Sequence, residues 1–204
     1  MIRSIFLLLL FAGGMIPAFG QYHLNENKVW VLGDRSGLDF NTTIPTPLTT
    51  GILGASGSYE SSASVCDPFG RLLFYTDGER VWSRNHAFMP NGNRLPPASS
   101  YSMVSSSSQG TIILPMIDSP GKYYIFSITC WEQKQSTPEY DGRLFYSVVD
   151  MQLNGGLGDV DPSRKWIPVD FNLAELIIAI PGNNNNIWLL THANDTNAFR
   201  VWEI

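Results

Sequence analysis

Short apolar runs recur along the chain from Val29 to its end, separated by clusters of Gly, Pro, Asn, Asp and Ser. The runs are rich in Val, Ile, Phe, Tyr and Trp, which is typical of β-strands. No stretch keeps the spacing of an amphipathic helix over several turns. We therefore predict an all-β protein with strands at residues 29–32, 63–65, 72–76, 110–117, 123–128, 144–151, 176–180, 187–191 and 199–204.

An internal repeat relates several of these strands. Residues 66–75 align with residues 117–126 at an offset of 51, which matches an Asp, a Gly, a basic residue and an aromatic-rich strand in one order. A looser third copy connects residues 177–180 to 187–190 through a Pro-Gly-Asn turn. Several strands per period of about 50 residues are typical of β-propellers. We predict an incomplete β-propeller-like array of antiparallel blades, with a β-sandwich as the alternative.

Composition and charge exclude several classes of protein. Hydrophobic residues make up 44% of the 204 residues and charged residues 15%, which is unlike a disordered, coiled-coil or collagen-like chain. The formal net charge of −5 offers no basic surface to nucleic acid or to an anionic membrane.

Residues 1–20 contain the three parts of a secretory signal peptide in order. Arg3 supplies the positive start, residues 5–11 the apolar core, and Ala-Phe-Gly the cleavage site before Gln21. Gly and Pro interrupt the apolar run too early for a membrane anchor. We expect residues 21–204 to be exported to the cell surface, the extracellular space or the periplasm, with no membrane span.

Several motifs are familiar as a set. They are Trp-Val-Leu-Gly-Asp-Arg-Ser-Gly-Leu-Asp-Phe-Asn at 30–41, Gly-Arg-Leu-Leu-Phe-Tyr-Thr-Asp-Gly at 70–78, Val-Trp-Ser-Arg-Asn-His at 81–86, Met-Pro-Asn-Gly at 89–92, Tyr-Tyr-Ile-Phe-Ser at 123–127, and Tyr-Ser-Val-Val-Asp-Met-Gln-Leu-Asn-Gly-Gly-Leu-Gly-Asp-Val at 146–160. In order and spacing, the set resembles the propeller-like domain near the N-terminus of large exported surface proteins of Bacteroidetes.

The resemblance covers residues 28–204 and implies an interaction domain of the cell surface without a known activity. In that family, further blades follow, often with polycystic-kidney-disease-type repeats and a C-terminal sorting or gliding-motility-associated domain read by type IX secretion. Because this sequence stops at Ile204, we expect residues 21–204 to be a propeller-like domain that lacks its C-terminal blades. We expect such a chain to be marginally stable or self-associating.

The two cysteines, Cys66 and Cys130, have two interpretations. An oxidising compartment would allow them to form a disulfide. Each also lies in or beside an apolar strand, where a thiol behaves as a small buried apolar group. Neither has a His or a second Cys at ligand spacing, which disfavours a metal site.

Two clusters of oxygen-bearing side chains are weak candidates for Ca²⁺. Asp159 and Asp161 end the Gly-rich stretch 154–161, and Asp34, Asp39 and Asn41 form the second cluster. Neither has the acid spacing of an EF-hand loop. Structural turns are the favoured interpretation, and we expect no other cofactor.

Catalytic motifs are scarce. Residues 77–82 approach the Asp-box of sialidase-type propellers, but Glu79 replaces a Gly, and a two-residue hairpin turn with Trp82 packed between blades is favoured. His23, His86 and His192 have no carboxylate or Cys at ligand spacing.

Three functions follow from these patterns. The first is a non-catalytic binding module that engages a protein or glycan through its blade loops, and the second is a purely structural spacer in a larger surface protein. The third is a glycan-acting propeller hydrolase with paired carboxylates, for which the sequence shows no pair.

Overall fold

The computed structural model describes residues 24–33, 35–48, 60–97, 106–130 and 142–204. These residues form fourteen β-strands and short 3-10 helices at Asn25–Asn27 and Asn154–Gly156, and no α-helix occurs among them. In the same ranges, no helix combines the length and apolarity needed to cross a bilayer. The predicted leader lies outside the described residues, and the all-β fold class is confirmed.

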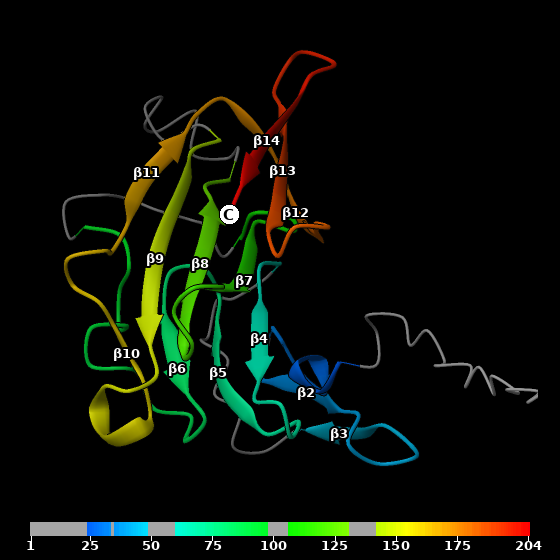
Figure 1. Cartoon of the computed structure of the whole chain (residues 1–204), viewed down its shortest axis with the longest axis vertical. Helices are drawn as coiled ribbons and strands as arrows, with labels where there is room; N and C mark the ends of the chain where they lie inside the picture. Colours follow the sequence, from blue (N-terminus) through cyan, green and yellow to red (C-terminus); the bar gives the residue numbers. More distant parts are fainter. Residues whose placement is uncertain (1–23, 34, 49–59, 98–105, 131–141) are drawn as a thin grey trace, which may run out of the picture.

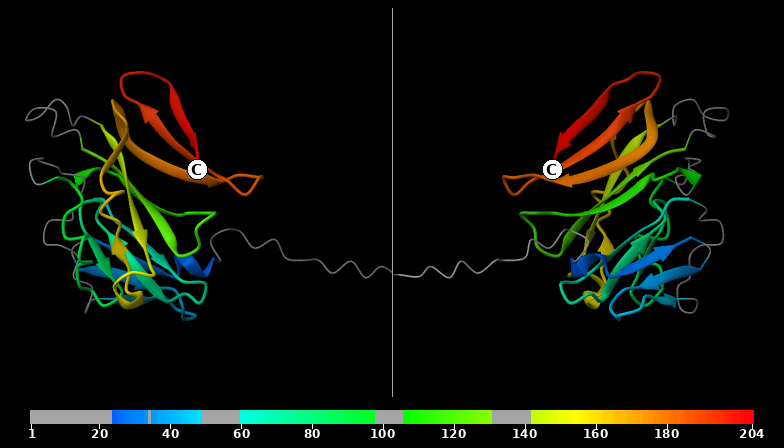
Figure 2. Two further views of the ribbon diagram at one scale, coloured as in Figure 1. Left: turned by 60° about the vertical axis from the view of Figure 1, so that its left-hand side comes forward. Right: turned by 90° about the vertical axis from the view of Figure 1, so that its right-hand side faces the viewer.

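The strands form four separate antiparallel sheets that follow one another along the chain (Figures 1 and 2). Sheet 1 contains β1 (Val29–Leu32), β2 (Ser36–Asp39) and β3 (Thr46–Leu48), and sheet 2 contains β4 (Ala63–Cys66), β5 (Leu72–Thr76) and β6 (Val81–Ser83). Sheet 3 contains β7 (Thr111–Pro115), β8 (Lys122–Ile128), β9 (Leu144–Asp150), β10 (Asp159–Val160) and β11 (Ile167–Asp170). Sheet 4 contains β12 (Leu173–Pro181), β13 (Ile187–Ala193) and β14 (Phe199–Glu203). Each of the nine predicted strands overlaps one of these strands.

Successive sheets pack face to face through apolar side chains. Val31 of sheet 1 packs with Tyr75 and Trp82 of sheet 2. Phe74 of sheet 2 belongs to a larger cluster with Ile125 and other residues of sheet 3. A third cluster joins sheets 3 and 4. Such pairwise stacking resembles a sandwich, but it is repeated three times along the chain, as in an array of blades.

The side chains of β8 pack alternately against the two sheets that neighbour sheet 3. Tyr123 and Ile125 pack in the cluster with sheet 2, whereas Tyr124 and Phe126 pack in the cluster with sheet 4. Successive residues of a strand point to opposite faces of its sheet. The apolar run at 123–128 is therefore nearly continuous because sheet 3 is covered on both faces.

The first strands of the four sheets lie next to one another: β1 contacts β4, β4 contacts β7, and β7 contacts β12. Ser64 joins the first two, since its hydroxyl donates to the Val29 carbonyl (2.8 Å) and accepts from the Val31 N–H (3.2 Å). Ser61, just before β4, donates to the hydroxyl of Thr111 in β7 (2.7 Å). We call β1, β4, β7 and β12 the inner strands, because together they have the place of the innermost strands of propeller blades.

The predicted repeat corresponds to the turn between the first two strands of a sheet. Gly70 lies between β4 and β5 with φ 81°, and Gly121 lies between β7 and β8 with φ 82°. Glycine adopts this left-handed conformation without steric cost, which explains why both copies of the repeat have it there. The looser third copy, with its Pro-Gly-Asn turn, joins β12 to β13 at the equivalent position of sheet 4.

Packing between sheets 2 and 3 predicts a large difference between two phenylalanines, Phe74 in β5 and Phe69 in the turn before it. Phe74 is fully buried and its ring meets Tyr123 edge-on at 5.4 Å, whereas Phe69 is 76% exposed. We expect Phe74→Ala to lower the free energy of unfolding by about 3–5 kcal/mol. Phe69→Ala, which loses mainly its contact with the Arg71 guanidinium, is expected to cost less than about 1 kcal/mol.

Chemical denaturation of the two variants, followed by tryptophan fluorescence, measures this difference. Similar losses in both variants would contradict the packing of sheet 2 on sheet 3.

Candidate functional site

A groove of about 640 Å³ runs along the inner strands, and we call it the inner-strand groove. All four sheets contribute to its walls, since residues of β1, β4, β7, β12 and β13 line it. Leu24 and Trp30 are its most exposed large side chains, at 52% and 48%. The fold therefore places this hollow where the sheets converge, whereas the sequence favoured the loops as the binding site.

The walls of the groove are mostly apolar, and none of the residues lining it is charged. Two of its hydroxyl groups have partners within the protein: Ser64 bonds to β1, and the Thr111 hydroxyl accepts a hydrogen bond from Ser61. The indole N–H of Trp30 donates to the Asn27 carbonyl at 3.0 Å, and the Trp30 ring packs against Phe40 with the ring centroids 5.0 Å apart. The groove thus offers apolar contact and few hydrogen-bonding groups.

A second cavity, of about 350 Å³, lies between sheets 1 and 2 and contains charged groups. Arg71, Arg84 and His86 line it together with one carboxylate, Asp39. The hydroxyl of Tyr75 lies 3.3 Å from Nδ1 of His86, and burial lowers the pKa of that histidine. A glycoside hydrolase would need two carboxyl groups across its substrate, whereas this cavity has one lining carboxylate.

Asp159, the first Ca²⁺ candidate, is 8% exposed and bonds to protein donors. Its carboxylate accepts from the backbone N–H and the side-chain amide of Asn91, at 2.8 and 2.7 Å, and from the N–H of Val160. Lys165 donates to the Asn91 carbonyl at 2.7 Å and completes this link. Asp159 belongs to β10 of sheet 3. Its hydrogen bonds therefore connect this strand to the segment that follows β6.

Asp161, the second candidate, closes a turn with its own neighbours. It accepts from Ser163 and forms an ion pair with Arg164 at 2.8 Å. These hydrogen bonds, first from Ser163 and then from Arg164, lower the pKa of Asp161 from 3.8 to about 2. Similar Asp–Arg pairs close the turns at Asp67 and Asp77.

The described residues contain no group of three or more His, Cys, Asp or Glu side chains that would hold a metal ion. In the other oxygen-rich cluster, Asp39 accepts from the N–H and the amide of Asn41, while Asp34 lies outside the described residues.

Cys66 and Cys130 are both buried, free thiols in this structure. Both side chains are fully buried. Burial raises the pKa of the Cys66 thiol to about 11, which keeps it protonated at neutral pH. Cys66 therefore contributes to packing and has no nucleophilic character.

The segment that approaches the Asp-box is a hairpin turn between β5 and β6, but it has four residues, 77–80, and not two. Asp77 is buried, which raises the pKa of its carboxyl although Arg80 lies 2.8 Å away. Trp82 is 3% exposed and stacks on Tyr75 at 5.4 Å, as predicted for a core residue between blades.

The remaining histidines contribute no site. His192 packs edge-on against Phe199 at 5.1 Å, and His23 lies outside the described residues.

The inner-strand groove was not predicted from the sequence, because no motif marks the residues that line it. One local feature pointed to it: residues 29–32 are apolar without alternation, although sheet 1 packs on only one neighbour. Val29 and Val31 are buried, whereas Trp30 and Leu32 are 48% and 41% exposed. A continuous apolar strand at the end of an array leaves one apolar face uncovered.

No family model, curated protein or solved structure matches the chain.

The burial of both thiols predicts their reactivity. We expect a disulfide-exchange reagent such as 5,5′-dithiobis(2-nitrobenzoate) to label neither Cys66 nor Cys130 in the native protein, because the thiols are fully buried. Unfolding in guanidinium without a reductant should then release two reactive thiols. Rapid labelling of the native protein, or no thiols after unfolding, would contradict the structure.

The low pKa of Asp161 predicts a pH-dependent contribution to stability. A carboxyl whose pKa falls from 3.8 to about 2 on folding stabilises the protein above pH 4, and this contribution is lost as the pH falls toward 2. We expect Asp161→Asn to lower the free energy of unfolding by about 1 kcal/mol at pH 7 and by less at pH 2.5.

The control is Asp118→Asn, at an exposed aspartate in the turn between β7 and β8. It should change stability little at either pH. A loss at Asp161 that stays constant between pH 7 and 2.5 would contradict the role of its ionised form.

Proposed function

We propose that this protein is an exported, non-catalytic binding module of the bacterial cell surface, and that its inner-strand groove holds an apolar segment of a partner protein. The observation that carries the proposal is the groove itself: a hollow of about 640 Å³, lined by residues from all four sheets, with no charged side chain among them. Concave, largely apolar surfaces with a few polar groups are typical of ligand sites.

The chemistry of the groove favours a protein segment over a glycan. A sugar presents hydroxyl groups that need hydrogen-bond partners, and an unpaired buried polar group costs about 1–3 kcal/mol. The hydroxyls of Ser64 and Thr111 already have partners within the protein. Trp30 offers one aromatic face for stacking, but Leu24 and Leu32 beside it favour aliphatic contacts.

The state of the carboxylates supports a non-catalytic role. Asp159 accepts hydrogen bonds from Asn91, and Asp161 is paired with Arg164. Asp77 is buried in a turn and paired with Arg80. The inner-strand groove is lined by no carboxylate and the cavity between sheets 1 and 2 by one. Hydrolysis of a glycoside by paired carboxylates finds no support in this arrangement.

Export and a bacterial surface location are supported by two features of the sequence. Residues 1–20 have the order of parts found in a signal peptide, and the motifs between residues 30 and 160 resemble the propeller-like domain of Bacteroidetes surface proteins.

The proposal is tested with an array of immobilised peptides that vary in apolar content and an array of glycans, both probed with the purified protein. We expect binding to peptides with several consecutive apolar residues. Trp30→Ala and Leu24→Ala should each weaken the best peptide about tenfold, which corresponds to about 1.4 kcal/mol.

Leu153→Ala is the matched control, because Leu153 is 42% exposed but does not line the groove. It should leave the peptide affinity unchanged. Binding to glycans alone, or peptide binding that Trp30→Ala and Leu24→Ala leave intact, would overturn the proposal.

A further inference from the structure

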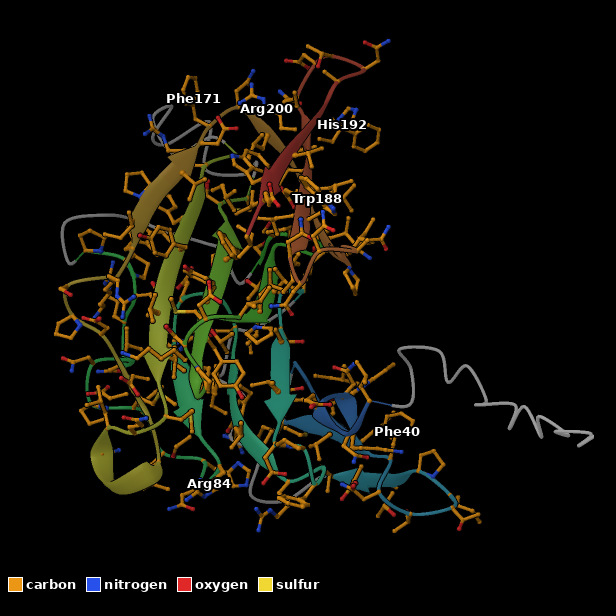
Figure 3. All side chains as sticks on the ribbon, viewed as in Figure 1. Phe40, Arg84, Phe171, Trp188, His192 and Arg200 are labelled. Carbon is orange, nitrogen blue, oxygen red and sulfur yellow. The ribbon has the colours of Figure 1, made fainter. Side chains whose placement is uncertain are left out.

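The cavity between sheets 1 and 2 has a lining unlike that of the inner-strand groove. Its volume of about 350 Å³ is at the lower end of the range of about 300–1,000 Å³ that is usual for small-molecule sites. Val29, Leu48 and Leu72 give it apolar walls, and charged and hydrogen-bonding side chains line it as well. Figure 3 shows one of these, Arg84, at the end of the molecule opposite the one that carries Phe171.

Two side chains of the turn after β6 bring hydrogen-bond donors to this cavity. Arg84 donates from Nη1 to the Gly156 carbonyl at 3.0 Å, which uses only one of its several N–H groups. It has no carboxylate partner among the described residues. Nδ1 of His86 lies 3.3 Å from the Tyr75 hydroxyl, and Nε2, the other ring nitrogen, has no partner in the described part of the chain. Burial lowers the pKa of His86, so that its ring is uncharged at neutral pH.

An acceptor comes from the opposite wall, in sheet 1. Oδ1 of Asp39 accepts from the backbone N–H and the side-chain amide of Asn41, both at 2.8 Å. Within the described ranges, Oδ2 of Asp39 has no hydrogen-bond partner and no cation pairs with the carboxylate. Donors and an acceptor with unused capacity therefore line the same cavity.

An exposed aromatic ring lies beside these polar groups. Phe69 lines the cavity and is 76% exposed, although the Arg71 guanidinium lies over its ring at 5.3 Å from the centroid. An aromatic ring adds an apolar surface on which the C–H groups of a ligand can pack.

Hydrogen bonds within the protein hold the walls of the cavity in place. The side-chain amide of Asn41 donates to the Gly70 carbonyl at 2.9 Å, which links sheet 1 to the turn before β5. The turn after β6 is closed by the N–H of His86, which donates to the Ser83 carbonyl, and by the N–H of Ser83, which donates to the Ala87 carbonyl, both at 2.9 Å. Polar groups that are ordered before a ligand arrives reduce the entropic cost of binding.

We propose that the cavity between sheets 1 and 2 binds a neutral sugar unit of a glycan. The hydroxyl groups of a sugar need both donors and acceptors, which Arg84, His86 and Asp39 supply. The C–H face of the sugar ring packs on Phe69. The inner-strand groove lacks this combination, because it has no charged lining residue and the hydroxyls of Ser64 and Thr111 already have partners.

The balance of charge favours a neutral sugar over an acidic one. Arg71 is compensated by Asp67, at 2.7 Å, so that Arg84 and Asp39 remain as lining charges of opposite sign. An anionic ligand would lie beside the Asp39 carboxylate, which repels it. The volume of the cavity limits the ligand to a short part of a glycan chain.

Saturation-transfer NMR of the purified protein tests the proposal, with the methyl glycosides of glucose, galactose, mannose and N-acetylglucosamine as probes and methyl glucuronide as the charged comparison. We expect at least one neutral glycoside to bind, with a dissociation constant of about 1 mM.

Two variants locate the bound sugar. Phe69→Ala removes the aromatic ring, and Asp39→Asn keeps an oxygen for Asn41 while it replaces the second carboxylate oxygen by an amide donor. Each should weaken the best glycoside about tenfold. Phe171→Ala is the matched control, because Phe171 is 63% exposed and does not line the cavity, and it should leave the affinity unchanged. Circular dichroism and thermal melting of each variant confirm that it is folded.

Three results would overturn the proposal: no binding of any neutral glycoside at about 10 mM, binding of methyl glucuronide alone, or binding that Phe69→Ala and Asp39→Asn leave intact. The result can be separated from that of the proposed function. Trp30→Ala and Leu24→Ala, which should weaken the apolar peptide, are expected to leave glycoside binding unchanged, since neither residue lines this cavity.

Discussion

Each sheet of this protein depends on a neighbour to cover its apolar faces. Three of the four sheets have only three strands, and a sheet of that size has little buried area of its own. Phe74 and Ile125 between sheets 2 and 3, or Phe126 and Leu189 between sheets 3 and 4, are buried only because two sheets meet. Stability in such an array is set mainly by the contacts between neighbouring units.

The same constraint explains what the charged residues do. With 15% charged residues, the chain uses many of its carboxylates to hold turns and to connect sheets. Asp77 and Asp161 pair with an arginine three residues later, and Asp159 connects the segment after β6 to sheet 3. These carboxylates are structural, which leaves apolar contact as the chemistry of the inner-strand groove. The proposed binding role thus arises from apolar surface that the described sheets leave uncovered.

The sequence predicted nine strands from their apolar runs and missed five short ones, namely β2, β3, β6, β10 and β11. Residues 72–76 and 123–128 were found because Phe, Tyr and Ile mark them clearly. β2, with the sequence Ser-Gly-Leu-Asp, and β3, with Thr-Pro-Leu, have weak strand propensity and exist because each pairs with the strand before it. The groove could not be predicted, because it forms only where strands from four sheets meet, and no local pattern records that meeting. The buried thiols were one of two interpretations, since the spacing of Cys66 and Cys130 does not determine their distance.

Hydrogen exchange measured by mass spectrometry tests most directly whether neighbouring sheets protect each other. Amides of β5 and β8, in sheets covered on both faces, should exchange slowly. Amides of β13 and β14, in sheet 4, which packs on one neighbouring sheet among the described residues, should exchange faster. The account is contradicted if β13 and β14 exchange as slowly as β8.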